Sequence, residues 1–200
     1  MIFWVPQHLE PRWKSYIVET TEPVLTSQQC DELIRIGQSE PLMKGETNMN
    51  DADSQKYRKS TISWIPINKK EVVPTYHIIK KWMETINNNH FGFNNMQMTE
   101  RGQYAEYSKD AFYNWHMDIG VDMSDMAPVR KISMTLILND PKEFEGGDLE
   151  IYCGEAVKHK FKLKRGYAVF FASFLLHRVK PVTEGNRKSL VMWFGGTPLR

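Results

Sequence analysis

The sequence predicts a mainly β fold with flanking helices, an α+β class in which N-terminal helices buttress a double-stranded β-helix of the jelly-roll or cupin-like kind. Helical periodicity and capping signals are confined to residues 20–95, whereas from Met96 onward apolar and polar residues alternate with a period of two. Turn residues recur between the expected strands and no helical crossover separates them, which is typical of antiparallel sheets rather than of a parallel sheet.

Length and composition indicate an ordinary soluble enzyme. We expect one domain over residues 1–200, with helical support at about 20–95 and the β-helix core at about 96–196. The 26 basic and 24 acidic residues give a formal charge of +2, which argues against a strong nucleic-acid or membrane partner. Cys30 and Cys153 are too few for a disulfide framework, so reduced thiols and a cytoplasmic location are expected. We find no signal peptide and no run of ~20 apolar residues.

Two helices are expected before the β-core. Thr26 and Gln29 have the spacing of a capping box, which predicts a helix after Thr26. Its expected buried stripe is Cys30, Leu33, Ile34 and Gly37. Pro74 opens a longer helix that extends to about Asn89. Its expected buried stripe is Ile78, Ile79, Trp82, Met83 and Ile86.

The remaining elements are expected to be strands and loops. Residues 59–67 read as a strand, and the polar residues 40–56 as a mobile loop. The later strands are expected near 97–107, 112–118, 130–138, 148–152, 157–163, 167–171, 174–182 and 187–194. The turn-rich stretch 139–148 is either a loop that folds over the site or a plain connector.

His116 and Asp118 form the first candidate site. The aromatic-rich residues 112–115 favour a strand, and in a strand the side chains at i and i+2 leave the same face. His116 and Asp118 therefore point to one spot, whereas Met117 points away. His177, in an apolar and strand-prone run, would complete a set of two histidines and one carboxylate. The alternative is that His177 is a core residue whose hydrogen bonds are satisfied within the protein. This set leaves coordination positions open, which suits non-haem Fe(II) that must bind O2 and a substrate together.

Arg187 is the candidate anchor for an acidic co-substrate. It follows a Glu-Gly-Asn turn at residues 184–186, and a hairpin there would return Arg187 alongside the strand that carries His177. A guanidinium binds a carboxylate in a bidentate manner and stays charged when partly buried. Ser189, two residues further on the same face, could add a hydroxyl donor. The alternative is that Arg187 is a surface residue.

The C-terminal half is similar to the 2-oxoglutarate- and Fe(II)-dependent dioxygenases, specifically to the prolyl 4-hydroxylase-like branch and its microbial and viral PKHD-type hydroxylases. The matching stretches, in the family's order, are Gln103-Tyr104-Ala105-Glu106-Tyr107, Tyr113-Asn114-Trp115-His116-Met117-Asp118, Arg130-Lys131-Ile132-Ser133, Leu138-Asn139-Asp140-Pro141, Glu145-Gly146-Gly147-Asp148-Leu149 and residues 177–189. They span roughly residues 97–196, whereas residues 20–95 match more loosely. If the source is viral, the expected location is the host cytoplasm.

The resemblance implies a reaction and its co-substrates. Fe(II) would be held by His116, Asp118 and His177, which are the catalytic residues through the metal. The co-substrates would be 2-oxoglutarate and O2, the co-products succinate and CO2, and ascorbate a reductant. The implied product is a hydroxylated C–H bond, expected in a prolyl residue of a peptide or protein.

The resemblance also assigns the co-substrate pocket. Arg187 would bind the far carboxylate of 2-oxoglutarate, and Tyr107 matches a co-substrate-binding tyrosine of the family. Some members hold this carboxylate with a further tyrosine, but the matching position here is Ile137. Thr135, Tyr107 or Ser189 is expected to take that role.

Three classes of function remain open. The first is a peptidyl hydroxylase, favoured by the loops at 40–56 and 119–129, because an extended peptide needs an open groove with movable walls. The second is an oxygenase that acts on a free amino acid, a small metabolite or a nucleobase. The third is a non-catalytic metal-binding barrel, which 2-oxoglutarate consumption would exclude. A zinc hydrolase is less attractive, because the motif supplies no general base beside a metal-bound water.

Overall fold

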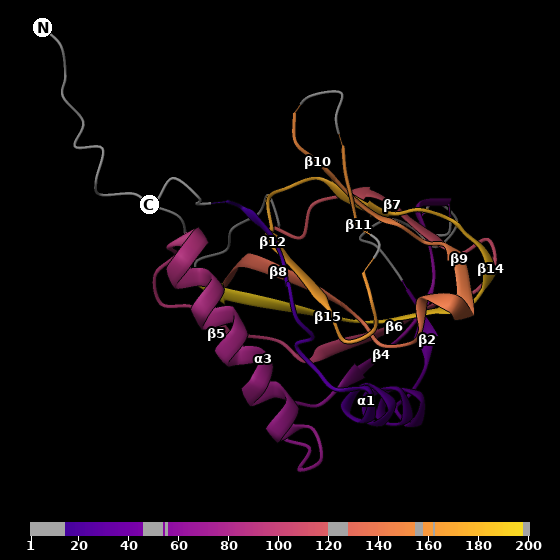
Figure 1. Ribbon diagram of the computed structural model, residues 1–200, viewed down its shortest axis with the longest axis horizontal. Coiled ribbons are helices and arrows are strands. Elements are labelled where there is room, and N and C mark those ends of the chain that lie inside the picture. The colour runs from indigo at the N-terminus through magenta and orange to yellow at the C-terminus, as the bar shows by residue number, and fades with distance from the viewer. Residues whose placement is uncertain are drawn as a thin grey trace, which may run out of the picture.

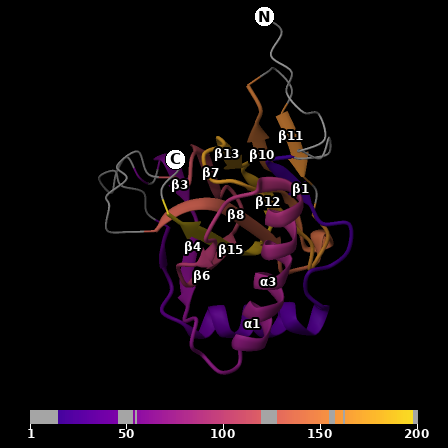
Figure 2. The ribbon, with the colours of Figure 1, turned by 90° about the vertical axis from the view of Figure 1, so that its left-hand side faces the viewer.

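The computed structural model describes residues 15–45, 54, 56–119, 128–154, 158–161 and 163–197. Most of the expected loops at 40–56 and 119–129 lies outside these ranges. Two antiparallel sheets face each other, and helices α1 (Ser27–Ser39) and α3 (Val73–Ile86) lie on the side of the larger sheet that points away from the smaller one (Figures 1 and 2). The predicted mainly β class with helical support is therefore observed.

The larger sheet has the strand order β1-β12-β8-β15-β6-β4-β2, with β5 paired to β15. Its strands are β1 (Ile17–Glu19), β2 (Met43–Lys44), β4 (Thr61–Ile65), β5 (Gln97–Met98), β6 (Gly102–Tyr107), β8 (Val129–Ile137), β12 (Ala168–Ala172) and β15 (Arg187–Gly196). The smaller sheet has the order β11-β10-β13-β7-β3. Its strands are β3 (Arg58–Lys59), β7 (Phe112–His116), β10 (Leu149–Tyr152), β11 (Lys158–Phe161) and β13 (His177–Val179).

Helix α1 starts as predicted. The Thr26 side chain accepts a hydrogen bond from the Gln29 backbone, and the Gln29 side chain accepts one from the Thr26 backbone, which completes the capping box. The buried residues of α1 are Cys30, Leu33, Ile36 and Gly37, so Ile36 takes the place expected for Ile34, which is only partly buried. An arginine ties the helix to the barrel, since Arg165 pairs with Asp31 and donates to the Leu138 carbonyl at 2.8 Å.

Helix α3 begins with Pro74 in its first turn and continues as a π-helical turn, η1 (Asn87–Phe91), that Gly92 ends in a left-handed conformation. The buried face of α3 comprises Thr75, Tyr76, Ile79, Met83 and Ile86. Ile78 and Trp82, which we expected in that face, are partly buried at its margin. Both helices cover one face of the larger sheet, and the largest apolar core lies between them and that face.

Successive side chains of β15 alternate between two environments. Leu190, Met192 and Phe194 belong to the core under the helices. Because side chains alternate along a strand, Arg187, Ser189, Val191 and Trp193 point to the opposite face, into the space between the two sheets. The same alternation sends Tyr104 of β6 to the helices and Gln103, Ala105 and Tyr107 to the interior, as predicted.

The structure corrects three expectations about the strands. The strand expected at 174–182 is a turn followed by the short β13, and the strand expected at 97–107 is divided into β5 and β6. The hairpin expected to place Arg187 beside the His177 strand is wrong. β13 pairs with β10 and β7 in the smaller sheet, whereas β15 pairs with β5, β6 and β8 in the larger one. Pro181 and the pairing of β14 (Val182–Gly185) with β9 (Phe144–Gly146) carry the chain from one sheet to the other.

Hydrogen bonds hold residues 139–148 in place. Asp140 caps the short 3-10 helix η2 (Pro141–Glu143) in a capping box with Glu143. Asn139 donates to the Asn186 carbonyl at 2.9 Å and accepts from the Lys188 backbone at 2.8 Å. These bonds fix η2 and β9 against the start of β15, which supports a fixed connector rather than a loop that closes over the site. In the part of the chain that the structure describes, no helix is both long and apolar enough to span a bilayer.

Replacing Gly37 with alanine is expected to destabilise the fold. An added Cβ would lie 2.3 Å from the Tyr104 Cγ, so α1 would have to move away from β6. Overpacking of this kind costs about 1–3 kcal/mol and, at a ring carbon that cannot swing away, outweighs the roughly 1 kcal/mol gain in helix propensity. We expect a net loss of up to about 2 kcal/mol in the free energy of unfolding, measured by urea denaturation. Gln28→Ala, on the exposed face, should change it by less than about 0.5 kcal/mol; equal effects of the two variants would contradict the close packing.

Candidate metal centre and co-substrate pocket

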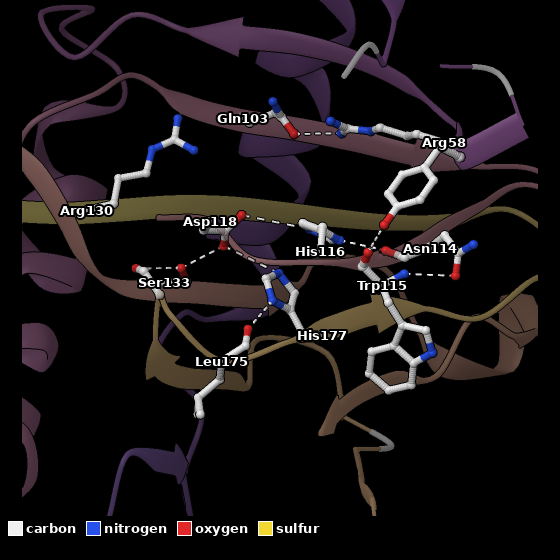
Figure 3. A network of polar contacts seen from close by, with 12 residues as sticks. Arg58, Gln103, Asn114, Trp115, His116, Asp118, Arg130, Ser133, Leu175 and His177 are labelled. Atoms are coloured by element: carbon white, nitrogen blue, oxygen red, sulfur yellow. Dashed lines mark hydrogen bonds and ion pairs between the residues drawn. The ribbon is translucent and has the colours of Figure 1, made fainter. Parts of the chain in front are cut away.

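His116, Asp118 and His177 converge between the sheets. One potential ligand atom from each lies within 4.8 Å of the others, and the Asp118 carboxylate lies 3.8 Å from His116 Nε2 and 3.4 Å from His177 Nε2 (Figure 3). The structure therefore brings together the three residues that the sequence selected as ligands.

Strand pairing explains why the two histidines meet. β7 and β13 are antiparallel neighbours, and His116 and His177 are directly opposite each other in their ladder, with ring centroids 4.1 Å apart. β7 ends at His116, so Asp118 lies just beyond the strand. The backbone N–H groups of Asp118 and Ile119 both donate to the Ser173 carbonyl, at 3.0 and 3.2 Å. This anchor directs the Asp118 side chain back towards the histidines.

Both imidazoles are oriented by backbone carbonyls. His116 Nδ1 lies 2.7 Å from the Asn114 carbonyl and His177 Nδ1 lies 3.0 Å from the Leu175 carbonyl. Since a carbonyl only accepts, each Nδ1 must carry a proton, and each Nε2 faces the shared space as the potential ligand atom. Burial, together with the neighbouring His177, lowers the pKa of His116 to about 3, so its ring is held neutral as a metal ligand requires.

Asp118 is held as a carboxylate. Burial by itself raises its pKa, but His177, His116 and the Ser133 hydroxyl together outweigh burial and hold the pKa of Asp118 well below its usual range. Ser133 of β8 donates to Asp118 Oδ2 at 2.6 Å and lies 2.9 Å from the Ser173 hydroxyl (Figure 3). Two imidazoles and one ionised carboxylate fit Fe(II) with open coordination positions.

Arg187 lies at one end of the inward-facing row of β15 and is 2% exposed. Its Nη1 donates to the Ser189 hydroxyl at 3.0 Å, and its guanidinium carbon lies 5.4 Å from the Tyr107 ring centroid. Burial lowers the pKa of Arg187, against the raising effect of Tyr107 and Asp148, but a guanidinium stays charged at neutral pH. The sequence-selected group of Arg187, Tyr107 and Ser189 is thus one contact cluster, with Tyr107 opposite Arg187 in the β6–β15 ladder.

Ile137 lies beside this cluster, opposite Ser189 in the β8–β15 ladder, and Thr135 lies opposite Val191, two residues further from Arg187. A pocket of roughly 400 Å³ adjoins the cluster. It is lined by Ile137, Pro141, Phe144, Glu145, Gly146, Gly147, Asp148, Leu149, Phe161, Leu163 and Arg187. Gly147 has a φ of +64°, and an added Cβ there would lie 2.8 Å from Arg187 Cδ, so the glycine lets the backbone pack against the arginine.

Sequence reasoning missed two positioning interactions. Tyr113 stacks on His116 with ring centroids 3.4 Å apart, although residues three apart on a regular strand face opposite sides. A bulge between β7 and β13 brings both rings to one face. Ser133 lies in one of the family-like stretches, but only the sheet-to-sheet contact shows that its hydroxyl meets Asp118.

A buried arginine was also missed. Arg58 is 6% exposed, donates to Gln103 Oε1 at 2.8 Å and lies 4.4 Å from the Tyr113 ring centroid, which places a cation beside the metal-ligand group (Figure 3). Nothing in the polar, charged run around Arg58 distinguishes it from a surface residue. Its burial follows from the pairing of β3 with β7.

Aromatic and cationic side chains gather at the end of the β15 row opposite to Arg187. Trp193 is directly opposite Ser133 in the β8–β15 ladder, and its ring centroid lies 6.0 Å from that of Trp64. Arg130, which pairs with Glu100, lies 4.0 Å from the Trp193 ring centroid. The Trp193 indole Nε1 is buried and has no hydrogen-bond partner among the described residues.

Comparisons with known proteins match this architecture. Residues 102–195 match the family model of the 2OG-Fe(II) oxygenase superfamily. A PKHD-type hydroxylase of Xylella fastidiosa (strain M12) is 37% identical over 98 residues, which cover 46% of this chain and 42% of that protein. A PKHD-type hydroxylase of Psychrobacter sp. (strain PRwf-1) is 37% identical over 93 residues, covering 45% and 36%. The chain thus spans less than half the length of these curated relatives.

Solved structures show the same fold. The crystal structure of a Pseudomonas putida prolyl-4-hydroxylase superposes with a TM-score of 0.69 at 22% identity, covering 92% of this chain and 94% of that one. A viral collagen prolyl hydroxylase from Paramecium Bursaria Chlorella virus-1, in a 2OG complex, superposes with a TM-score of 0.70 at 24% identity, covering 92% and 97%. The predicted resemblance and the double-stranded β-helix fold are confirmed.

Ser133→Ala is expected to weaken metal binding. The variant removes the hydroxyl that orients Asp118, and loss of such an outer partner costs roughly 10–100-fold in metal affinity. Titration with Mn(II) by calorimetry measures the effect. Ser189→Ala is the matched control, because it removes a buried hydroxyl of the same size that contacts Arg187 and not Asp118. Unchanged Mn(II) affinity in Ser133→Ala would show that the carboxylate needs no support.

Gly147→Ala is expected to weaken the binding of 2-oxoglutarate by displacing Arg187. A shift of about 1 Å in a positioning group costs on the order of tenfold or more, measured as the dissociation constant at saturating metal. Gly154→Ala is the matched control, since Gly154 also has a positive φ, of +82°, but an added Cβ there meets nothing within 4 Å. If Gly154→Ala weakens 2-oxoglutarate binding as much as Gly147→Ala does, backbone strain rather than contact with Arg187 explains the loss of affinity.

Proposed function

We propose that this chain is an Fe(II)- and 2-oxoglutarate-dependent dioxygenase that hydroxylates an unactivated C–H bond, because residues 102–195 match the 2OG-Fe(II) oxygenase superfamily model and the chain shares the fold of a solved prolyl-4-hydroxylase. The proposed substrate is a prolyl residue in a peptide or protein. Residues 1–200 act as one catalytic domain, with ascorbate as the reductant. The free thiols of Cys30 and Cys153 support a reducing compartment such as the cytoplasm.

One observation carries the proposal. Two imidazoles and a carboxylate converge between the sheets, and a buried guanidinium without a carboxylate partner among the described residues lies in the same interior. An unpaired buried cation destabilises the fold, because removing the cation from water costs on the order of several kcal/mol. A metal and a dicarboxylic co-substrate together account for both features.

One group of residues binds the metal, and another binds the co-substrate. Bound Fe(II) supplies the activation of O2, coupled to the oxidative decarboxylation of 2-oxoglutarate to succinate and CO2. His116, Asp118 and His177 hold the metal through Nε2, a carboxylate oxygen and Nε2. The Asn114 and Leu175 carbonyls keep the proton on each Nδ1, so neither histidine is available as an acid.

Arg187, supported by Ser189 and Tyr107, binds and orients the far carboxylate of 2-oxoglutarate. Two apolar clusters line the space between the sheets around the metal ligands and Arg187. One, with Phe171 and Leu149, contacts His177 through the Phe171 ring at 4.6 Å, and the other contains Ala105, Tyr107 and Val182. They keep bulk water from the space between the sheets, which strengthens the pairing of Arg187 with a carboxylate.

Side chains at the Trp193 end of the barrel support a peptide substrate. Trp64 and Trp193 offer ring surface to a pyrrolidine, and Arg58 and Arg130 are donors for peptide carbonyls. A prolyl hydroxylase in complex with a hypoxia inducible factor peptide fragment from Trichoplax adhaerens superposes with a TM-score of 0.68 at 18% identity, covering 90% of this chain and 83% of that one.

We expect the Fe(II)-loaded protein to consume 2-oxoglutarate and to add one oxygen atom to a proline in members of a proline-containing peptide library, detected by mass spectrometry.

His116→Ala, Asp118→Ala and His177→Ala should abolish both 2-oxoglutarate consumption and peptide oxidation, because each removes a metal ligand. Arg187→Ala should mainly raise the KM for 2-oxoglutarate, by about 10- to 150-fold if a charge-assisted pair of about 1.5–3 kcal/mol is lost.

Other outcomes would reject parts of the proposal. Full succinate production by Asp118→Ala would contradict the ligand assignment. Oxidation of a free amino acid, metabolite or nucleobase with no modified peptide would replace the prolyl substrate by the small-molecule alternative. Failure of the iron-loaded wild-type protein to consume 2-oxoglutarate would leave a non-catalytic metal-binding barrel.

A further inference from the structure

The strand that carries the first histidine ligand is irregular just before it. Two residues of β7, between Tyr113 and His116, stand opposite a single residue of β13, Arg178. This arrangement is a β-bulge, and its two residues are Asn114 and Trp115. A bulge disrupts the ladder locally, so the backbone N–H and C=O groups within it need partners from elsewhere.

Side chains supply partners to the bulged backbone. The Trp115 N–H donates to the side-chain oxygen of Asn114, Oδ1, at 2.8 Å (Figure 3). The Tyr57 hydroxyl donates to the Trp115 carbonyl. The Asn114 carbonyl in turn accepts from His116 Nδ1 at 2.7 Å. One asparagine therefore uses its side chain to hold the next peptide group and its backbone to hold the imidazole of a metal-ligand candidate.

The two histidines obtain their carbonyl partners in different ways. Leu175, which bonds to His177, precedes β13 and lies in a turn in which its N–H donates to the Ala172 carbonyl at 2.9 Å. Asn114 lies inside β7, where a carbonyl is ordinarily an acceptor of the ladder. The bulge therefore makes the Asn114 carbonyl available to His116, whereas the Leu175 carbonyl needs no such distortion.

Trp115 is fixed on the face of the smaller sheet that points away from the larger sheet. The guanidinium carbon of Arg178 lies 4.6 Å from the Trp115 ring centroid, and Arg178 Nε donates to Glu150 at 2.8 Å. Glu150 is buried, and the Tyr152 ring lies edge-on to Trp115 with centroids 6.2 Å apart. These contacts hold the Trp115 side chain outward while His116 points inward, so the backbone between the two has little freedom.

We infer that Asn114 is a positioning residue for the first histidine ligand. Its side-chain oxygen accepts the Trp115 N–H and holds the bulge in the conformation that directs the Asn114 carbonyl to His116 Nδ1. The carbonyl keeps a proton on Nδ1, so that Nε2 is the atom offered to the metal. An aliphatic side chain at position 114 removes the acceptor and releases the bulge. This inference rests on the proposed function, because it treats His116 as a metal ligand.

The ring tautomers of the metal-free full chain test the inference without turnover. Nitrogen NMR of both imidazoles is recorded at about pH 8, where a histidine with the ordinary pKa of about 6.5 is neutral. We expect both rings of the wild type to carry the proton on Nδ1. In Asn114→Ala, His116 should populate the Nε2–H tautomer, whereas His177 should keep its proton on Nδ1, because the Leu175 carbonyl is untouched. Calorimetry should show roughly 10–100-fold weaker Mn(II) binding by Asn114→Ala.

Two further variants separate positioning from a general loss of stability. Asn114→Asp keeps an acceptor oxygen and should restore the wild-type tautomer of His116. Its added charge by itself changes Mn(II) affinity, so the tautomer decides this comparison. Asn87→Ala is the matched control, because the Asn87 side-chain oxygen also accepts a backbone N–H, from Phe93 at 3.0 Å, but lies in η1. It should leave both tautomers and the Mn(II) affinity as in the wild type.

If Asn114→Ala does not fold, Tyr57→Phe removes the hydroxyl from the Trp115 carbonyl of the same bulge and should shift the His116 tautomer in the same direction. An unchanged His116 tautomer in the folded variant overturns the inference and leaves the proposed function intact. Equal tautomer changes at both histidines, or no restoration by Asn114→Asp, also overturn it. If the wild type binds no Mn(II), the proposed function itself fails, whatever the tautomers show.

Discussion

The antiparallel pairing of β7 with β13 is the contact on which the rest of the candidate site depends. It sets His116 directly opposite His177, and the turn before β13 supplies the Ser173 carbonyl that anchors Asp118. All three metal-binding candidates thus belong to the smaller sheet or its immediate continuation. Arg187 belongs to the larger sheet, so the spacing between the sheets sets the distance over which a co-substrate must extend. Hydrogen bonds from Ser133 to Asp118 and from Arg58 to Gln103 link the sheets across that space.

The interior accepts charges that a structural core would exclude. Asp118, Arg187 and Arg58 are all nearly inaccessible to solvent, and desolvation of each charge costs on the order of several kcal/mol. The histidines and Ser133 compensate Asp118, and Gln103 with Ser60 satisfies part of Arg58. Among the described residues, Arg187 has a hydroxyl and an aromatic ring as partners and forms no ion pair. The separate apolar core under α1 and α3 supplies stability that does not depend on these residues, so the space between the sheets can be shaped for binding.

Agreement between sequence and structure is best where the determinants are local. The capping box at Thr26, the helix after Pro74 and the inward direction of Gln103, Ala105 and Tyr107 were all predicted. Each follows from contacts within a few residues of the chain. The errors involve pairing partners. The expected hairpin between the His177 and Arg187 strands is a crossing from one sheet to the other, and the β7 bulge that stacks Tyr113 on His116 left no sequence signal.

By itself the sequence determined the fold class, the side-chain types of the candidate site and the strand face shared by Gln103, Ala105 and Tyr107, because period-two alternation and capping are local steric properties. Only the tertiary structure decided that His177 and Arg187 occupy opposite sheets, that the guanidinium has no carboxylate partner among the described residues, and that Arg187 and Ile137 line one pocket. Those features depend on which strands become neighbours and on how side chains from distant segments fill the space between them. That is a property of the packed chain as a whole, to which residues far apart in the sequence contribute together.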